Sequence, residues 1–100
     1  MTLHNIEIGE EQIAAFCRAN GIRKLALFGS VLRDDFRPES DVDVLVEFKP
    51  GVQVGLAFIR MQDELSALLG RSVDLHTPGS LSRYFRDEVL NEAETLYVAA

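Results

Sequence analysis

The sequence has few of the features that mark disulfide-stabilised or membrane-spanning proteins. Among its 100 residues there is one cysteine, Cys17, and no tryptophan. A single cysteine excludes an internal disulfide and a cysteine-based metal cluster. The longest apolar runs are far shorter than the ~20 residues that a membrane-spanning helix needs. The first dozen residues show no signal-peptide pattern, so we expect a cytoplasmic protein with no membrane association.

Positive charge is also scarce. The chain carries 10 Lys and Arg against 16 Asp and Glu, a formal net charge of −6. Binding to nucleic acid without sequence preference relies on clusters of Lys and Arg that displace counterions. We therefore expect no stable nucleic-acid binding. A site for a polyanion such as a triphosphate must be local, with help from a metal cation.

What remains is the composition of a soluble globular domain, with 47% hydrophobic and 26% charged residues. The length predicts one domain over residues 1–100. Hydrophobic periodicity predicts helices within residues 8–22, 30–35, 58–69 and 81–89, and strands at 22–29, 41–48 and 71–77. Residues 95–98 fit either an edge strand or a tail. Helices that alternate with strands indicate an α+β fold, with a small mixed sheet covered by helices mainly on one face.

Carboxylates on the strand at residues 41–48 need an explanation. Asp41 and Asp43 are two residues apart, so a strand projects both from one face, roughly 6.5–7 Å apart. Their like charges repel unless a cation lies between them. Asp74 is on another predicted strand and reaches the same region if the two strands are neighbours. An all-oxygen ligand set is typical of Mg²⁺ or Mn²⁺ rather than zinc.

A Gly-Ser pair ends the strand before these aspartates. Gly29 lets the backbone turn sharply and approach a ligand, because it has no Cβ. Ser30 begins a predicted short helix, where free N–H groups favour an anion. Arg33 lies one turn further on. Beside a metal site, this arrangement predicts a phosphate-binding loop for phosphoryl or nucleotidyl transfer.

Gly29-Ser30, ten residues and then Asp41-Val42-Asp43 resembles the signature of the DNA polymerase β-like nucleotidyltransferase superfamily. The stretches "GSVLR", "SDVDVLVEF" and "EAETLYV" are similar to those of its minimal nucleotidyltransferase (MNT) domains. The resemblance spans Leu25 to Val98. It implies the polymerase β-like fold, ATP as substrate, two Mg²⁺ ions (with Mn²⁺ as the alternative) and nucleotidyl transfer. In the antitoxin branch, AMP goes to a tyrosine of a HEPN-domain RNase toxin encoded nearby.

The resemblance also implies a role for each matching residue. Gly29 and Ser30 would hold the triphosphate, and Arg33 would neutralise phosphate charge. Asp41 and Asp43 would ligate the metals. Asp74 would be the third carboxylate, which ligates the metal that activates the attacking hydroxyl and accepts its proton.

Each residue also has a structural interpretation. Asp41 and Asp43 could form a solvated strand face, Ser30 could be only a helix N-cap, Asp74 an edge-strand charge, and Arg33 a salt-bridge partner. His76 shares the strand face of Asp74, yet such a histidine is more often a surface or packed residue than a base or ligand. Tyr84 and Tyr97 are interpreted as packing residues rather than AMP acceptors.

Two other functions compete with protein adenylylation. The chain could be a non-catalytic antitoxin that masks its toxin. It could instead be a nucleotidyltransferase acting on RNA or a small molecule, which its acidity and the lack of an added recognition domain disfavour.

Overall fold

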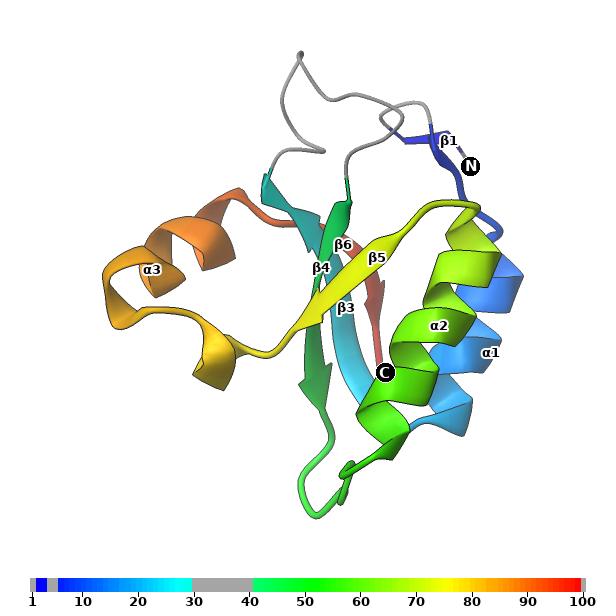
Figure 1. Cartoon of the computed structure of the whole chain (residues 1–100), viewed down its shortest axis with the longest axis horizontal. Coiled ribbons are helices and arrows are strands. Elements are labelled where there is room, and N and C mark those ends of the chain that lie inside the picture. Colours follow the sequence, from blue (N-terminus) through cyan, green and yellow to red (C-terminus); the bar gives the residue numbers. More distant parts are fainter. Residues whose placement is uncertain (1, 4–5, 30–40, 100) are drawn as a thin grey trace.

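The computed structural model describes residues 2–3, 6–29 and 41–99, in which a four-stranded sheet has helices on both sides (Figure 1). The helices are α1 (Glu10–Ala19), α2 (Ala57–Leu69) and α3 (Arg83–Glu92), with a 3-10 turn, η2 (Pro78–Ser80), before α3. The strands are β1 (Thr2–Leu3), β2 (Ile6–Glu7), β3 (Ile22–Phe28), β4 (Val42–Phe48), β5 (Val73–His76) and β6 (Glu94–Val98). The order predicted from the sequence is confirmed for these described elements. The β1–β2 hairpin has no counterpart among the predicted ones, and the short helix predicted at 30–35 lies outside the described residues.

The sheet is mixed. Its strand order is β5-β4-β3-β6, with β4 and β5 parallel and the other two pairs antiparallel. The prediction of an α+β fold with a small mixed sheet is confirmed. The C-terminal segment, which the sequence left open between a strand and a tail, is the edge strand β6.

One face of the sheet carries the core. Val42, Val44 and Val46 of β4 are fully buried there, because alternate residues of a strand point to the same side. Helices α1 and α2 cover this face (Figure 1). The buried residues of the two helices are Ile13, Phe16, Cys17, Met61, Leu65 and Leu69, which confirms the predicted core positions of the first two helices. Tyr97 packs against the same cluster, as expected.

The C-cap residues Asn20 and Gly70 end these two helices at the positions predicted from the sequence. Asn20 caps α1, and its side-chain Nδ2 donates to the Phe16 carbonyl at 2.8 Å. Gly70 follows α2 with φ 65°, a left-handed conformation that costs a glycine little, and its N–H donates to the Ser66 carbonyl. These caps fix the points at which the chain enters β3 and β5.

The opposite face of the sheet carries the polar residues. Phe28 of β3 and Asp74 of β5 lie on either side of Asp43 in the strand register, and His76 lies beside Leu45. Residues opposite one another on paired strands point to the same face, so these side chains share one surface. The sheet thus separates an apolar core from a polar site across one layer of backbone.

Helix α3 lies on the other side of the sheet from α1 and α2 (Figure 1). None of its residues, all of which the structure describes, is buried, and Tyr84 and Phe85 are 80% and 60% exposed. The expectation that Tyr84 packs is therefore wrong. Arg86 ties the helix to the preceding turn by donating to the carbonyls of Pro78 at 2.9 Å and Leu81 at 3.2 Å. Within the described residues, no helix is long and apolar enough to cross a bilayer.

Candidate active site

Two carboxylates from different strands meet on the polar face of the sheet. Asp43 of β4 and Asp74 of β5 are direct partners in the parallel register. Neighbouring strands are ~4.8 Å apart, so parallel pairing in this register places the two side chains next to each other. The sequence-based expectation that Asp74 faces the same region as Asp43 agrees with this placement.

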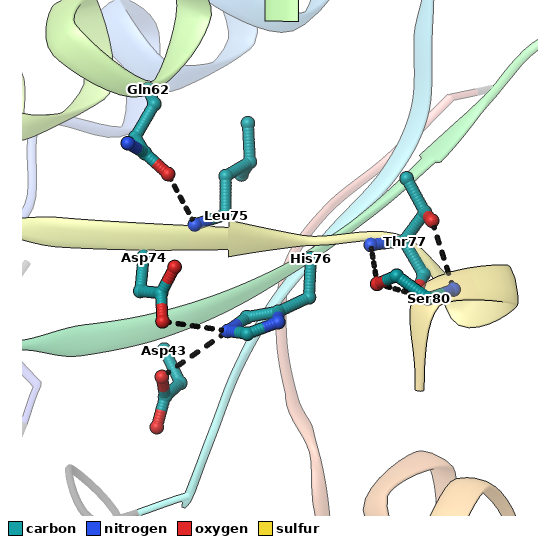
Figure 2. Close-up of polar contacts among 7 residues, drawn as sticks. All are labelled: Asp43, Gln62, Asp74, Leu75, His76, Thr77 and Ser80. Carbon is teal, nitrogen blue, oxygen red and sulfur yellow. Dashed lines mark hydrogen bonds and ion pairs between the residues drawn. The ribbon is translucent and has the colours of Figure 1, made fainter. Parts of the chain in front are cut away.

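A histidine nitrogen lies between the two carboxylates (Figure 2). Nε2 of His76 is 3.4 Å from Oδ1 of Asp43 and 3.2 Å from Oδ2 of Asp74. One ligand atom from each of the three residues lies within 4.8 Å of the other two. The sequence marked His76 only as a residue on the face of Asp74; the parallel register turns that position into a contact.

The environment of Asp43 disfavours its negative charge. Its pKa is raised above the ordinary value, mainly because burial removes water from the carboxylate. The charges of Asp74 and Asp41 raise this pKa further, while the hydrogen bond and charge of His76 act against them. A carboxylate in such a place gains from a cation, which offsets both the lost hydration and the repulsion.

Side chains of α2 hold β5 in place from its outer edge. The N–H of Leu75 donates to Oε1 of Gln62 at 2.9 Å (Figure 2), and the N–H of Val73 donates to Oγ of Ser66 at 3.0 Å. The Ser66 hydroxyl in turn donates to the Gln62 carbonyl at 2.8 Å. An edge strand otherwise leaves such N–H groups unpaired. The position of Asp74 between these two anchored residues is therefore fixed by helix α2.

The backbone and ring around His76 are fixed as well. Directly after it, the N–H of Thr77 donates to Oγ of Ser80 at 3.1 Å, and the Ser80 N–H donates to Oγ1 of Thr77 at 3.3 Å (Figure 2). The imidazole also meets the Phe28 ring edge to face, with centroids 5.2 Å apart. This packing orients the imidazole, whose nitrogen lies beside the two carboxylates.

Gly29 lies against the same carboxylate. It has φ 76°, and a Cβ built on it would lie 2.5 Å from Oδ2 of Asp43. Both the left-handed backbone and the close approach require glycine. The loop that begins at Gly29 therefore starts beside the Asp43–Asp74 pair, where a bound phosphate group could share a cation with them.

The remaining predicted site residues are placed differently. Asp41 is exposed and precedes the first residue of β4. Among the residues that the structure describes, the group that converges within 4.8 Å consists of Asp43, Asp74 and His76, without Asp41. Asp41 acts on the site through its charge on Asp43. Ser30 and Arg33 lie outside the described residues, so their phosphate-binding roles stay predictions.

A pocket of about 260 Å³ adjoins the site between the end of β3 and helix α3. Phe28 and Gly29 form one wall, and the other is formed by α3 residues, namely Phe85, Glu88, Val89 and Glu92. Its volume is below the roughly 300–1,000 Å³ of pockets that enclose a whole small molecule, so it has room for part of a nucleotide. This pocket could not be predicted from the sequence, because the apolar spacing of α3 fits core packing equally well.

The donor atoms of the site fit a divalent cation. Mg²⁺ in nucleotide enzymes is usually held by one or two carboxylates, with substrate phosphates and water completing the shell. Asp43 and Asp74 supply two such carboxylates, and the neighbouring loop starts at Gly29. The imidazole of His76 adds a nitrogen donor.

Comparison with known proteins gives the family. The sequence-family model of the nucleotidyltransferase domain matches residues 10–96. The chain belongs to the nucleotidyltransferase domain family. A Methanocaldococcus jannaschii protein named provisionally as a protein adenylyltransferase is 35% identical over 89 residues, or 89% of this chain and 95% of that protein. The protein adenylyltransferase MntA of Thermococcus cleftensis is 40% identical over 72 residues, or 72% of each chain. This chain is thus a nucleotidyltransferase.

Solved structures agree with this nucleotidyltransferase fold. One assigned provisionally as a minimal nucleotidyltransferase has a TM-score of 0.69 at 36% identity, covering 84% of this chain and 85% of its own. A toxin–antitoxin structure with AMP-PNP has a TM-score of 0.70 at 23% identity, and the match covers 92% of this chain and 75% of that chain. A structure of a tri-AMPylated Shewanella oneidensis HEPN toxin in complex with MNT antitoxin has a TM-score of 0.62 at 24% identity. The match covers 90% of this chain and 70% of that chain. The last two likenesses show the fold alone.

Proposed function

We propose that this nucleotidyltransferase is a protein adenylyltransferase that moves AMP from ATP to a tyrosine hydroxyl of a HEPN-type toxin, and so acts as its antitoxin. The observation that carries the proposal is the meeting of Asp43 and Asp74 beside the left-handed turn at Gly29. Carboxylates that repel each other next to a loop predicted to bind phosphate suit a metal-dependent transfer of a nucleotidyl group.

The relatives support the choice of AMP and of a protein acceptor. The Thermococcus cleftensis relative is named a protein adenylyltransferase. Among the structural neighbours, one toxin–antitoxin structure contains AMP-PNP, and in another the HEPN toxin is tri-AMPylated. The shared family and fold make the same reaction the simplest proposal for this chain.

In the proposed reaction, the acceptor oxygen bonds to the α-phosphorus of ATP, the bond from that phosphorus to the bridging oxygen breaks, and pyrophosphate leaves. Asp41, Asp43 and Asp74 would hold two divalent ions, Mg²⁺ or Mn²⁺, which would supply charge to polarise the phosphate and to lower the pKa of the attacking hydroxyl. Gly29 and Ser30 would hold the triphosphate, and Arg33 would offset its charge.

The two paired carboxylates differ in their access to an acceptor. The side chain of Asp74 is 54% exposed, whereas that of Asp43 is 28% exposed. An incoming hydroxyl therefore reaches Asp74 more readily, which favours Asp74 as the group that accepts the proton. Asp43, which is more enclosed and touches Gly29, is better placed to bind the shared cation on the phosphate side.

The test uses the purified chain with the protein encoded next to it, which we expect to be a HEPN toxin. ATP labelled at the α-phosphate should label the partner, and ATP labelled at the γ-phosphate should not. Asp74→Asn keeps the shape of the side chain and removes its charge, so we expect it to abolish labelling. Asp63→Asn, a change at an exposed position of α2, is the matched control and should label as the wild type does.

Two results would reject the proposal. Equal labelling by the wild type and the Asp43→Asn/Asp74→Asn double variant would show that the carboxylates do not serve the reaction. Transfer of the γ-label in place of the α-label would indicate phosphorylation. Conversion of the labelled partner tyrosine to phenylalanine tests the acceptor separately.

Antitoxin action by masking has its own supporting observation. Helix α3 exposes Tyr84, Phe85 and Leu90, an apolar set suited to a protein partner. Cells that express the toxin decide between the two modes. If the double aspartate variant still binds the toxin but no longer protects the cells, catalysis is required; protection by that variant would favour masking.

A further inference from the structure

His76 adds a different kind of donor to the carboxylate site. Its imidazole nitrogen is grouped with oxygens of Asp43 and Asp74 within 4.8 Å. Carboxylates suit Mg²⁺ and Mn²⁺, whereas imidazole suits transition ions and is a poor partner for Mg²⁺. A nitrogen at this point therefore bears on which metal the site selects.

The contacts of His76 with the two carboxylates also have the spacing of ligands that share one ion. Charge-assisted N–H···O bonds are about 2.7–2.9 Å long. The His76 nitrogen is 3.4 Å from Oδ1 of Asp43 and 3.2 Å from Oδ2 of Asp74, so both contacts are longer than such bonds. Donor atoms about 2.1 Å from one ion lie about 3.0 Å apart at a right angle and about 3.4 Å apart at the tetrahedral angle. The separations of 3.2 and 3.4 Å lie within this range for neighbouring ligands of one ion.

The surroundings keep the nitrogen in this position. Edge-to-face packing on Phe28 orients the ring, and the hydrogen bonds between Thr77 and Ser80 fix the backbone that follows. In the register, His76 lies beside Leu45, a buried residue of the central strand β4. A ligand held by its neighbours in this way is already arranged for binding, since little side-chain freedom is lost when the ion enters.

We propose that His76 is a metal ligand together with Asp43 and Asp74, and that this mixed nitrogen–oxygen set binds Mn²⁺ in preference to Mg²⁺. The inference rests on the proposed function for the position of the metal site, and it assigns the site a nitrogen ligand and a metal preference. It concerns binding, so it is tested without ATP and without a partner protein.

The experiment follows Mn²⁺ by electron paramagnetic resonance in the purified chain. The wild type should bind Mn²⁺ at least about tenfold more tightly than Mg²⁺, measured by competition, since Mg²⁺ gains little from nitrogen. His76→Phe keeps a ring against Phe28 but has no donor, so Mn²⁺ affinity should fall about tenfold or more. His76→Gln offers an amide oxygen instead, so the preference for Mn²⁺ over Mg²⁺ should shrink.

A spectroscopic arm detects the nitrogen itself. Electron spin echo modulation should show an imidazole nitrogen coupled to Mn²⁺, and incorporation of ¹⁵N-histidine should change its frequency. The other histidine of the sequence, His4, provides the control: His4→Gln should keep the signal, which must then come from His76. This arm leaves the site unchanged, so it does not depend on the folding of any His76 variant.

The outcomes separate this inference from the proposed function. Equal Mn²⁺ affinity in the wild type and His76→Phe, or bound Mn²⁺ without histidine coupling, would overturn the ligand role even if AMP transfer is observed. Histidine coupling together with the Mn²⁺ preference supports the inference, whatever the acceptor of the transferase proves to be.

Discussion

Replacing Gly29 by alanine would separate backbone strain from damage to the carboxylate site. Gly29 has φ 76°, and a Cβ there would lie 2.5 Å from Oδ2 of Asp43. The left-handed conformation costs an L-residue about 1–2 kcal/mol. In a chain of this size, that loss lowers the unfolding temperature by about 4–8 °C per kcal/mol.

The close contact affects a different property. The Cβ would be about half an ångström nearer to Oδ2 than real Cβ atoms come, so one of the two must move. The end of the Asp43 side chain yields more easily than the backbone, at a cost of about 0.5–1.5 kcal/mol for a strained rotamer. Displacement of a metal-binding carboxylate by up to ~1 Å lowers catalysis by roughly 100-fold. We therefore expect a modest loss of stability and a large loss of activity.

Gly51→Ala is the matched control. Gly51 has φ 85°, and a Cβ built there meets nothing within 4 Å. It should lower the unfolding temperature through the left-handed backbone alone, and so by less than Gly29→Ala, while AMP transfer and Mn²⁺ binding stay at the wild-type level. Thermal unfolding by circular dichroism, with both activity measurements on the same samples, completes the test. If Gly29→Ala retains wild-type transfer and Mn²⁺ affinity, Gly29 does not shape the site.

Two further variants test the buried charge of Asp43 and the apolar core beneath helix α2. Burial raises the pKa of Asp43 above its ordinary value of 3.8, so an ionised Asp43 destabilises the folded state. This loss of stability is present above the raised pKa and disappears as the pH falls towards 3.8. In EDTA at neutral pH, Asp43→Asn should therefore unfold at a higher temperature than the wild type, and this gain should shrink on acidification. Asp63→Asn should show no such gain. A gain that does not depend on pH would contradict the raised pKa of Asp43. Leu65→Ala removes a fully buried side chain of α2 and should cost about 2–5 kcal/mol in urea unfolding. The exposed Ile59→Ala on the same helix should change stability by less than about 0.5 kcal/mol, and equal losses at both positions would argue against the core as described.

Much of the fold followed from local patterns. The alternation of Val42, Asp43 and Val44 fixes both the strand and its two faces, because a strand has a period of two. The amphipathic spacing and the closing Gly70 likewise predicted α2 to within a residue or two. These features depend on neighbours in the sequence, which is why they could be found without coordinates.

The site depends on the pairing of strands β4 and β5, which no local sequence pattern predicts. Asp74 reaches Asp43 only because β5 pairs parallel to β4 in one register, and the same register brings His76 to both. The spacing of Asp41 predicted another carboxylate on this strand face; Asp41 precedes the first residue of β4, and its role as a metal ligand stays a prediction. Helix α3 shows a similar limit: an apolar stripe does not reveal whether its own chain covers it.

The most direct measurement is an anomalous difference map at the manganese absorption edge from crystals of the wild-type chain grown with Mn²⁺. We predict a peak about 2.0–2.3 Å from carboxylate oxygens of both Asp43 and Asp74 and from Nε2 of His76, beside Gly29. A well-ordered site without a peak at saturating Mn²⁺, or a peak bound away from Asp43 and Asp74, would contradict the metal-dependent transfer proposed for this nucleotidyltransferase.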